Sequence, residues 1–483
     1  MLNISKELFT AWNKAGLLYC HWKSNEHLLP GLDGTTDLDV LLSRDNQEAG
    51  EEILRQLDFL KCKSQYGSRY PGVEDWIGFD KETGALIHVH LHYQLVTGHK
   101  GMKEYTLPWS DLALKTRVFS DEYGVYTMEP NLELVTLYTR IGLKVDFKDI
   151  IRCRVGKFKM DKAVIREMVW LKERVDMEKV GQLLEMYYGN DASQMMFFIR
   201  LEKIDAITYL KLRKIAERNF RKFSRVHCFM RLREVSYYFH QKYTKRLFVK
   251  FKPVISKKVP ASEKGLLIAF LGQDGAGKTT VTHKLIKWWS WKLDVRYVYL
   301  GSGDNYTSWK KNLVKRLPTS GPLRYLRSII ALTDTRDLTR KAYRNMRSAE
   351  RYASRGGLVI LDRYPQMEHA GICDGPKIRQ KVVQNYGNGN IAKLLMPLAR
   401  TEEKYIRKIL AIKPSIVFKL ILPPEESIRR KPQENYEAVK IKHEIVKSLP
   451  FDDSDVYTID ATMPFEEEMV MVKNIIWQHI QKS

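Results

Sequence analysis

The stretch GLLIAFLGQDGAGKTT, residues 265–280, decides the fold of the second half of this chain. Its first part, residues 265–271, is a continuous apolar run of the kind that forms a strand buried on both faces of a parallel sheet. The glycines that follow let the backbone turn tightly before the next element begins. We expect a helix to start at Thr280, with residues 281–289 as its body, so a strand, a tight loop and a helix follow one another.

The loop itself, residues 272–279, matches the pattern G-x-x-x-x-G-K-[ST]. In this pattern the backbone N–H groups point at phosphate oxygens, Lys278 places a cation against them, and the Thr279 hydroxyl is a ligand for Mg²⁺. The dipole of the following helix adds positive charge at the same place. The sequence therefore predicts ATP bound together with Mg²⁺. The nucleotide-binding residues predicted in the loop are Gly272, Asp274, Gly275, Ala276, Gly277, Lys278, Thr279 and Thr280.

A second strand pattern, residues 357–361, runs directly into Asp362 and Arg363. An acid at the carboxyl end of a buried strand lies where open α/β sheets bind their ligands. Asp362 can bind Mg²⁺ or orient an acceptor oxygen, and Arg363 can bind an acceptor phosphate through two N–H groups. A salt bridge at the strand end is the alternative interpretation. We predict Lys278, Asp362 and Arg363 as catalytic residues, with Thr279 and Asp362 at the metal ion.

Strand and helix patterns alternate to the end of the chain, and three further strands are expected at residues 295–300, 415–422 and 456–459. The loop with its Asp274, the Asp362-Arg363 pair and a basic segment after the fourth strand resemble the thymidylate kinase-like P-loop kinases, over residues 264–483. This resemblance implies a nucleotide-kinase fold with a five-stranded parallel sheet. It also implies that Asp274 faces the acceptor and that a basic lid with Arg429 and Arg430 closes over ATP.

Two departures from that family concern the acceptor. Residues 301–305 do not supply the Phe-Pro-x-Arg segment that recognises thymidylate, and residues 365–368 and 374–376 differ from the stretch that contacts thymine. The expected activity is therefore transfer of the γ-phosphate of ATP to a small acceptor for which thymidylate is a poor substitute. A nucleoside monophosphate-like compound and another small metabolite both fit this expectation.

Near the N-terminus, Asp37 and Asp39 precede an apolar run, and their spacing places both carboxylates on one face of a strand. Two such carboxylates can hold the Mg²⁺ ions of a nucleotidyl transfer. With Lys23-Ser24 upstream, residues 1–125 resemble the polymerase β-type nucleotidyltransferases. The resemblance implies an α/β domain in which Asp37 and Asp39 bind metal ions.

The same domain departs from that family in two places. Lys23 stands where a glycine is expected, at the turn that would face the triphosphate, and the strand at residues 86–92 offers His88, His90 and His92 instead of a third carboxylate. A metal ion can use these histidines together with the two acids. The alternative is an exposed polar strand face, and the activity of the domain stays open between nucleotidyl transfer and binding alone. Asp75 and Asp80 carry no motif.

The middle of the chain, residues 126–251, has a helical apolar pattern, and a linker with two prolines is expected at residues 252–263. Residues 201–260 carry 17 Lys and Arg against four Asp and Glu. This excess predicts either a surface for nucleic acid or anionic lipid, or a solvated helical face beside two phosphate-handling domains. No RNA-recognition, KH or zinc-finger pattern accompanies it.

The composition fits a cytoplasmic protein of several domains, with 44% hydrophobic and 29% charged residues and a net charge of +24. Five scattered cysteines form no CxxC pair, no signal-peptide pattern opens the chain, and no apolar run is long enough to span a bilayer.

Two other functions remain open beside the kinase. They are a nucleic-acid-associated or nucleotide-sensing protein of the defence type, and an ATP-driven switch without an acceptor. The oligomeric state is also open, a homodimer included.

Overall fold

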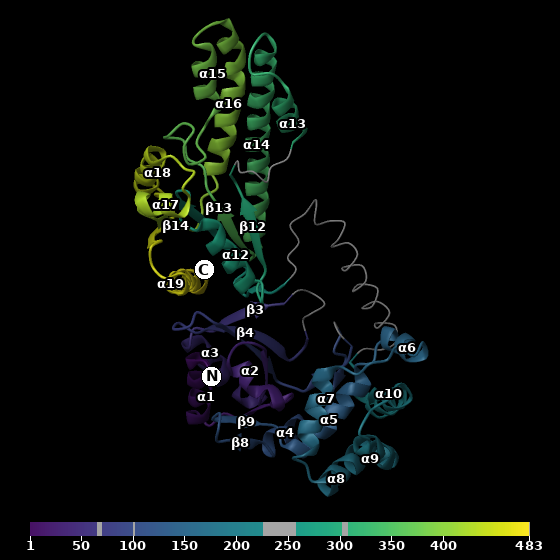
Figure 1. Ribbon diagram of the computed structural model, residues 1–483. Helices are drawn as coiled ribbons and strands as arrows, with labels where there is room; N and C mark the ends of the chain where they lie inside the picture. The colour runs from purple at the N-terminus through teal and green to yellow at the C-terminus, as the bar shows by residue number, and fades with distance from the viewer. Residues whose placement is uncertain (65–69, 100–101, 226–256, 302–307, 483) are drawn as a thin grey trace. The chain divides into compact units, whose positions relative to one another are not determined.

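A computed structural model describes residues 1–64, 70–99, 102–225, 257–301 and 308–482 (Figure 1). The chain divides into two compact units, Met1–Leu247 and Phe248–Ser483, each with its own sheet and core. None of the helices within these described ranges is both long and apolar enough to cross a bilayer.

The N-terminal unit is built on a mixed sheet with the strand order β3-β4-β5-β2-β1-β9-β8. Its strands are β1 (Tyr19–His21), β2 (Asp37–Leu42), β3 (Leu60–Lys63), β4 (Val73–Phe79), β5 (Leu86–His92), β8 (Val118–Ser120) and β9 (Val125–Thr127). The central strand β5 is parallel to β2 and antiparallel to β4, so side chains from three separate segments meet on each face. A small antiparallel pair, β6 (Val96–Thr97) and β7 (Tyr105–Thr106), stands apart from this sheet.

The two faces of this sheet differ in chemistry because side chains alternate along each strand. One face, with Val40 of β2 and Val89 of β5, packs against helices α1 (Asn3–Lys14) and α3 (Gln47–Gln56) in one apolar cluster. The opposite face carries the polar residues of β2 and β5. Trp22, which follows β1, belongs to a second apolar cluster formed mainly by helices.

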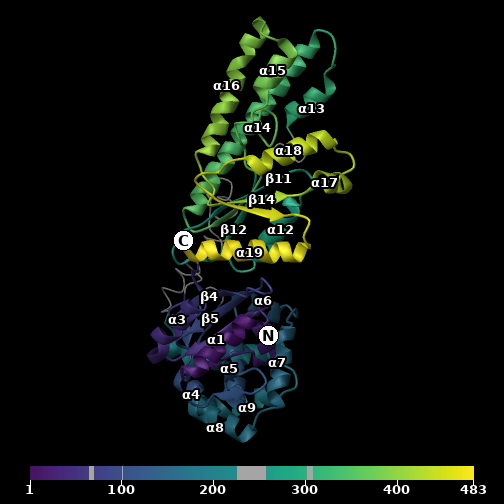
Figure 2. The same cartoon turned by 90° about the vertical axis from the view of Figure 1, so that its left-hand side faces the viewer.

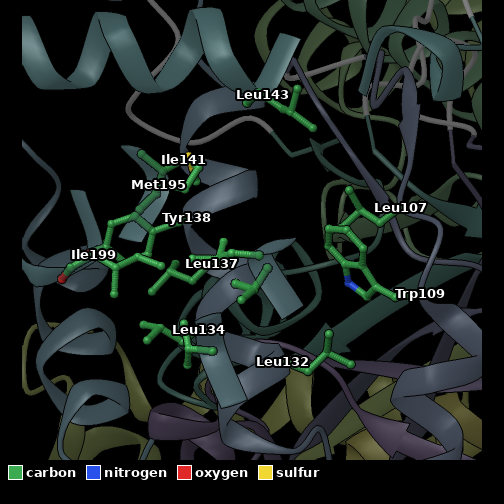
Figure 3. Packing of buried hydrophobic residues seen from close by; sticks show 14 of the residues in the cluster. Leu107, Trp109, Leu132, Leu134, Leu137, Tyr138, Ile141, Leu143, Met195 and Ile199 are labelled. Carbon is green, nitrogen blue, oxygen red and sulfur yellow. The ribbon is translucent and has the colours of Figure 1, made fainter. Parts of the chain in front are cut away.

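Helix α5 (Pro130–Leu143) is the centre of that second cluster and is buried along nearly its whole length. Its first turn is capped by the Glu129 side chain, which accepts a hydrogen bond from the Leu132 N–H. Figure 3 shows Leu134 and Tyr138 of α5 packed among residues from other helices, Met195 included. The helices around α5 are α4 (Ser110–Lys115), α6 (Phe147–Arg154), α7 (Lys162–Lys172), α8 (Met177–Tyr188), α9 (Ala192–Arg200) and α10 (Ala206–Phe220). The predicted helical character is confirmed for the described residues 130–220 of this region, and the helices other than α6 share one core with β1 and β2 of the sheet.

The C-terminal unit contains a five-stranded sheet with the order β12-β13-β11-β14-β15, in which all neighbours are parallel. Its strands are β11 (Leu267–Gly272), β12 (Val295–Tyr299), β13 (Leu358–Asp362), β14 (Ile416–Ile421) and β15 (Asp455–Asp460). The helices are α12 (Lys278–Trp289), α13 (Trp309–Arg316), α14 (Leu323–Ala353), α15 (Ile378–Tyr386), α16 (Asn390–Leu410), α17 (Pro424–Arg430), α18 (Tyr436–Ser448) and α19 (Phe465–Lys482). The predicted five-stranded parallel sheet is confirmed.

Helices cover both faces of this sheet, as the apolar composition of its strands requires. On one face, Ala269 and Val359 pack against α14, α16 and α18. On the other, Phe270 stacks on Phe418 with ring centroids 5.0 Å apart, next to α12 and α19. Helices α14 and α16 lie side by side and extend past the sheet (Figures 1 and 2).

The described end of the expected linker contacts the C-terminal unit. The Lys257 N–H donates to the Asp294 carboxylate over 2.7 Å, and the Asp294 N–H donates to the Lys258 carbonyl over 2.8 Å. Val259 is buried. Residues 226–256, with much of the basic charge and Cys228, lie outside the described residues, so the nucleic-acid surface at residues 201–260 stays a prediction.

Candidate functional site

The loop between β11 and α12 has the backbone conformation that its glycines predict. Gly275 and Gly277 have φ values of +87° and +82°, in the left-handed region that glycine adopts without strain. Helix α12 begins at Lys278, so the predicted start at Thr280 was wrong by two residues. The correction matters because Lys278 and Thr279 then lie in the first helical turn, where backbone N–H groups lack partners within the helix and face a potential anion.

Lys278 is folded back onto the loop. Its ammonium donates to the carbonyls of Gly272 and Gln273 over 2.7 and 2.8 Å, and the side chain is only 9% exposed. Burial, together with the positive charge of Arg363, lowers the pKa of Lys278 to about 8. The ammonium is therefore held at the mouth of the loop by neutral acceptors, which an anionic ligand can replace.

Asp362 lies at the carboxyl end of β13, beside Phe270 of β11. Its Oδ2 atom accepts hydrogen bonds from the Thr279 hydroxyl at 3.2 Å and from the Tyr297 hydroxyl at 2.8 Å. Its Oδ1 atom is buried and has no hydrogen-bond partner among the residues that the structure describes. A buried carboxylate oxygen without a partner, next to a threonine hydroxyl, fits a hard divalent cation such as Mg²⁺.

Arg363 lies next to two further acids at the end of the sheet. Its guanidinium is 3.9 Å from Asp274 and 3.5 Å from Asp374, and it lies 5.8 Å from the centre of the Tyr299 ring. Asp274 also accepts from the Lys442 ammonium at 2.6 Å. Burial alone would raise the pKa of Asp274, but the hydrogen bond and charge of Lys442, together with the charges of Lys278 and Arg363, outweigh burial, so the pKa is lowered.

A cavity of about 460 Å³ opens between β12 and α14, next to Asp362. Its lining includes Tyr297 and Tyr299 from the strand, and Lys341 and Asn345 from the helix. Sequence reasoning missed these residues, together with Asp374 and Lys442. The alternating tyrosines of β12 were the available signal, because a strand places residues i and i+2 on the same side.

Helix α17, which corresponds to the predicted basic lid, contacts the phosphate loop. The Ser427 hydroxyl donates to the Asp274 carbonyl, and Arg430 donates to the carbonyls of Gly275 and Ala461 over 3.4 and 3.1 Å. Arg429 is exposed and forms an ion pair with Glu426 at 2.7 Å. Of the two predicted arginines, Arg430 lies at the loop and Arg429 points to solvent.

In the N-terminal unit, the register of β2 on β5 places Asp37 beside His88 and Asp39 beside His90. The Asp37 carboxylate is 2.7 Å from His88 Nδ1, and Asp39 Oδ1 is 3.3 Å from a ring nitrogen of both His90 and His92.

Lys23 completes the cluster, with its ammonium 2.7 Å from Asp39. Burial would raise the pKa of Asp39, but Lys23 and the two histidines hold it well below its usual value. Lys23, at the position where a glycine is expected, thus supplies a cation to Asp39.

The alternative of an exposed polar face on β5 is wrong. His88 and His92 are fully buried, although Ile87, Val89 and Leu91 are buried on the other face as expected. The ring of His92 lies 5.2 Å from the ring of Trp22, which belongs to the helical cluster. The sequence could not show that helices from a distant segment cover this face.

The turn at Ser24, which would face a triphosphate in a nucleotidyltransferase, is bonded to acids. The Ser24 N–H donates to Glu167 and the Asn25 N–H to Glu133, both over 3.0 Å. Burial raises the pKa of Glu133 to about 7. Two N–H groups that could bind phosphate are therefore satisfied by carboxyl groups, which also repel an anion when ionised.

No family model matches the chain. The chain is 27% identical over 229 residues to the uncharacterized ATP-binding protein YghR of Escherichia coli K12, which spans 44% of this chain and 86% of that protein. It is 28% identical over 220 residues to the uncharacterized ATP-binding protein YghS of the same strain, over 42% of this chain and 88% of that protein.

Among solved structures, thymidylate kinase from Ehrlichia chaffeensis aligns with 19% identity and a TM-score of 0.25, over 44% of this chain and 99% of that chain. Deoxyadenosine kinase from M. mycoides with bound dATP aligns with 15% identity and a TM-score of 0.28, again over 44% and 99%.

Proposed function

We propose that the C-terminal unit is an ATP-dependent kinase that transfers the γ-phosphate to a small acceptor. The observation that carries the proposal is the arrangement around Asp362 at the end of β13: its Oδ2 accepts from the Thr279 hydroxyl, and its Oδ1 has no hydrogen-bond partner among the described residues. The two relatives are both named as ATP-binding proteins, which supports ATP as the nucleotide. The N-terminal unit has no part in this proposal.

Different groups of the loop bind different parts of the triphosphate and its metal ion. The N–H groups in the first turn of α12 and the Lys278 ammonium bind phosphate oxygens, with Lys278 leaving the carbonyls of Gly272 and Gln273 to do so. Thr279 and Asp362 would hold Mg²⁺, which neutralises charge on the phosphates when bound. Both arginines pair with Glu426, but Arg430 also donates to the Gly275 carbonyl and so lies close enough to the loop to add a cation.

The acceptor is expected on the β12 side of Asp362, in the 460 Å³ cavity. Arg363 at its edge offers a planar guanidinium for a phosphate or carboxylate, and the Tyr299 ring beneath it fixes its orientation. A cavity of this size suits a single small metabolite. Asp362 can orient the attacking hydroxyl of the acceptor. Its Oδ2 atom is accessible to a hydroxyl donor from this side, because it already accepts a hydrogen bond from the Tyr297 hydroxyl.

The nucleotidyltransferase resemblance of the N-terminal unit stays a prediction. Lys23 is engaged by Asp39, and the Ser24 turn is bonded to Glu167, so a triphosphate would have to displace both contacts. These contacts favour a binding role over nucleotidyl transfer.

The test is a phosphoryl-transfer screen of the purified full-length protein against a panel of small metabolites with ATP and Mg²⁺, read by mass. We expect ADP release that depends on one class of acceptor and is lost in Lys278→Ala. Lys287→Ala, an exposed lysine of the same helix, is the matched control and should retain activity. ATP hydrolysis that no acceptor stimulates would instead indicate a switch, and absence of ATP binding would overturn the assignment.

A further inference from the structure

A second cluster of possible metal ligands lies on β4 and β5 of the N-terminal unit, and it includes an acid that no motif marks. Asp75 of β4 is directly opposite His90 of β5 in the antiparallel register. Its Oδ1 atom is 2.9 Å from His90 Nε2 and 3.0 Å from His88 Nε2. The three ligand atoms all lie within 4.8 Å of one another.

The spacing of these atoms matches the coordination shell of a small divalent ion. Ligands about 2.0–2.1 Å from a tetrahedral zinc ion are roughly 3.3 Å apart, close to the 2.9 and 3.0 Å found here. Each ring nitrogen faces the same carboxylate oxygen, so either protons or one cation must lie between these atoms. A single metal ion satisfies all three at once.

The outer contacts of the three side chains also match a metal site. The other ring nitrogen of His88 is 2.7 Å from Asp37, and that of His90 is 3.3 Å from Asp39. Metal-binding histidines in proteins usually donate their second N–H to such a carboxylate, which fixes the ring and makes it a stronger ligand. The second oxygen of Asp75 accepts from the Ser64 hydroxyl at 2.6 Å.

A neighbouring group, Asp39 with His90 and His92, is a weaker candidate. The Lys23 ammonium is 2.7 Å from the Asp39 oxygen that faces both histidines, so a metal ion there would lie against a cation. The Asp75 group has its ligand atoms on the opposite side of the histidine rings from Asp37 and Asp39.

We propose that Asp75, His88 and His90 bind one divalent transition-metal ion, Zn²⁺ being the first ion to test, with Asp37 and Asp39 as positioning residues. Two imidazole nitrogens and one carboxylate oxygen select zinc or iron over Mg²⁺, which prefers oxygen ligands and bound water. Three protein ligands leave a coordination position open for water or an anion. The sequence suggested Asp37 and Asp39 as metal ligands. In this proposal they instead bond to the second ring nitrogens of His88 and His90 and orient these rings.

The experiment uses the full-length protein, stripped of metal with a chelator and titrated with Zn²⁺ by calorimetry, with bound metal counted by elemental analysis. Co²⁺ in place of zinc reports the ligand geometry by its visible absorption. We expect one equivalent of zinc. Asp75→Asn and His88→Gln should each weaken binding by at least about 100-fold, and Asp37→Asn by about 10- to 100-fold.

His27→Gln, a histidine outside the cluster, is the matched control and should bind zinc like the wild type. Lys278→Ala should also retain zinc, and His88→Gln should retain phosphoryl transfer, which separates this proposal from the kinase assignment. Circular dichroism shows whether each variant is folded. The proposal is overturned if the wild-type protein binds no stoichiometric zinc, or if folded His88→Gln and His27→Gln bind it equally. It is also overturned if Asp37→Asn with Asp39→Asn abolishes Mg²⁺ binding while His88→Gln leaves zinc unchanged.

Discussion

The phosphate loop and the group formed by Asp39, Lys23, His90 and His92 differ in how their charges are balanced. At the loop, the Lys278 ammonium is bonded only to neutral carbonyls, and the Asp362 carboxylate keeps one oxygen without a partner in the described part of the chain. In the cluster, Asp39 contacts Lys23, His90 and His92 on a single oxygen atom. The phosphate loop therefore has charges left for a ligand, whereas the charge of Asp39 is balanced by its own neighbours.

The largest expected effect is on the rate of phosphoryl transfer at the phosphate loop. Lys278→Ala removes the cation that binds the phosphates, and we expect the rate of phosphoryl transfer to fall by about 100- to 1000-fold. The melting temperature should change little, because the ammonium bonds only to loop carbonyls. Steady-state kinetics and calorimetric melting, with Lys287→Ala alongside, measure both. If Lys278→Ala lost stability but kept its rate of phosphoryl transfer, Lys278 would be a structural residue and not a ligand-binding one.

Lys23→Met, next to Asp39, should lower the stability of the protein and leave the rate of phosphoryl transfer unchanged. The lysine and Asp39 side chains are 17% and 14% exposed, so removal of the ammonium leaves a largely buried carboxylate without its cation. We expect a loss of about 3 kcal/mol in the free energy of unfolding, measured by urea denaturation in the presence of a chelator. Lys14→Met, an exposed lysine of α1, is the control and should lose almost none. Equal stability of the two variants would show that the histidines alone balance Asp39.

A pH experiment compares Asp39 with Glu468 of α19, a buried acid whose pKa is shifted in the opposite direction. Glu468 is 5% exposed, its Oε1 has no hydrogen-bond partner among the described residues, and burial raises its pKa from 4.5 to about 7. The native protein thus keeps a proton that the unfolded chain releases. The stability from this group is present below about pH 4.5 and is lost as the pH rises through 7.

The glutamine side chain in Glu468→Gln is neutral at every pH, so this variant should not lose stability as the pH rises from 4.5 through 7. At pH 8 we expect the variant to be more stable than the wild type by up to about 3 kcal/mol, with little difference at pH 4.5. Urea denaturation at both pH values tests this, and Glu467→Gln, its exposed neighbour, should show no such change. A larger gain at pH 4.5 than at pH 8 contradicts the assignment.

The smallest effect concerns the support of Asp362. Tyr297→Phe removes one hydroxyl that donates to its carboxylate, and a hydrogen bond to a charged group is worth about 1.5 kcal/mol. We expect kcat/KM to fall about tenfold with the fold unchanged. Tyr405→Phe on α16, away from the cavity, is the matched control. An unchanged kcat/KM would mean that Asp362 is positioned by Thr279 alone.

The same contrast explains what the sequence could predict. The phosphate loop is contiguous and each residue type has a known role, so the loop, the sheet and the placement of Asp362 at a strand end followed directly. Asp75 reaches His88 and His90 only through the register of β4 on β5, which no local pattern encodes. Lys442 likewise meets Asp274 from 168 residues away along the chain. Local chemistry could be predicted, and partners brought together by tertiary pairing could not.

The contact between α17 and the phosphate loop has a kinetic consequence. Ser427 and Arg430 donate to the backbone carbonyls of Asp274 and Gly275 in the loop. Nucleotide exchange that requires α17 to move away must break both. At about 1 kcal/mol for each bond, the open state is populated roughly thirtyfold less than it would be without them. The dwell time of a nucleotide on the protein then depends on a serine whose hydroxyl donates to the backbone of the loop.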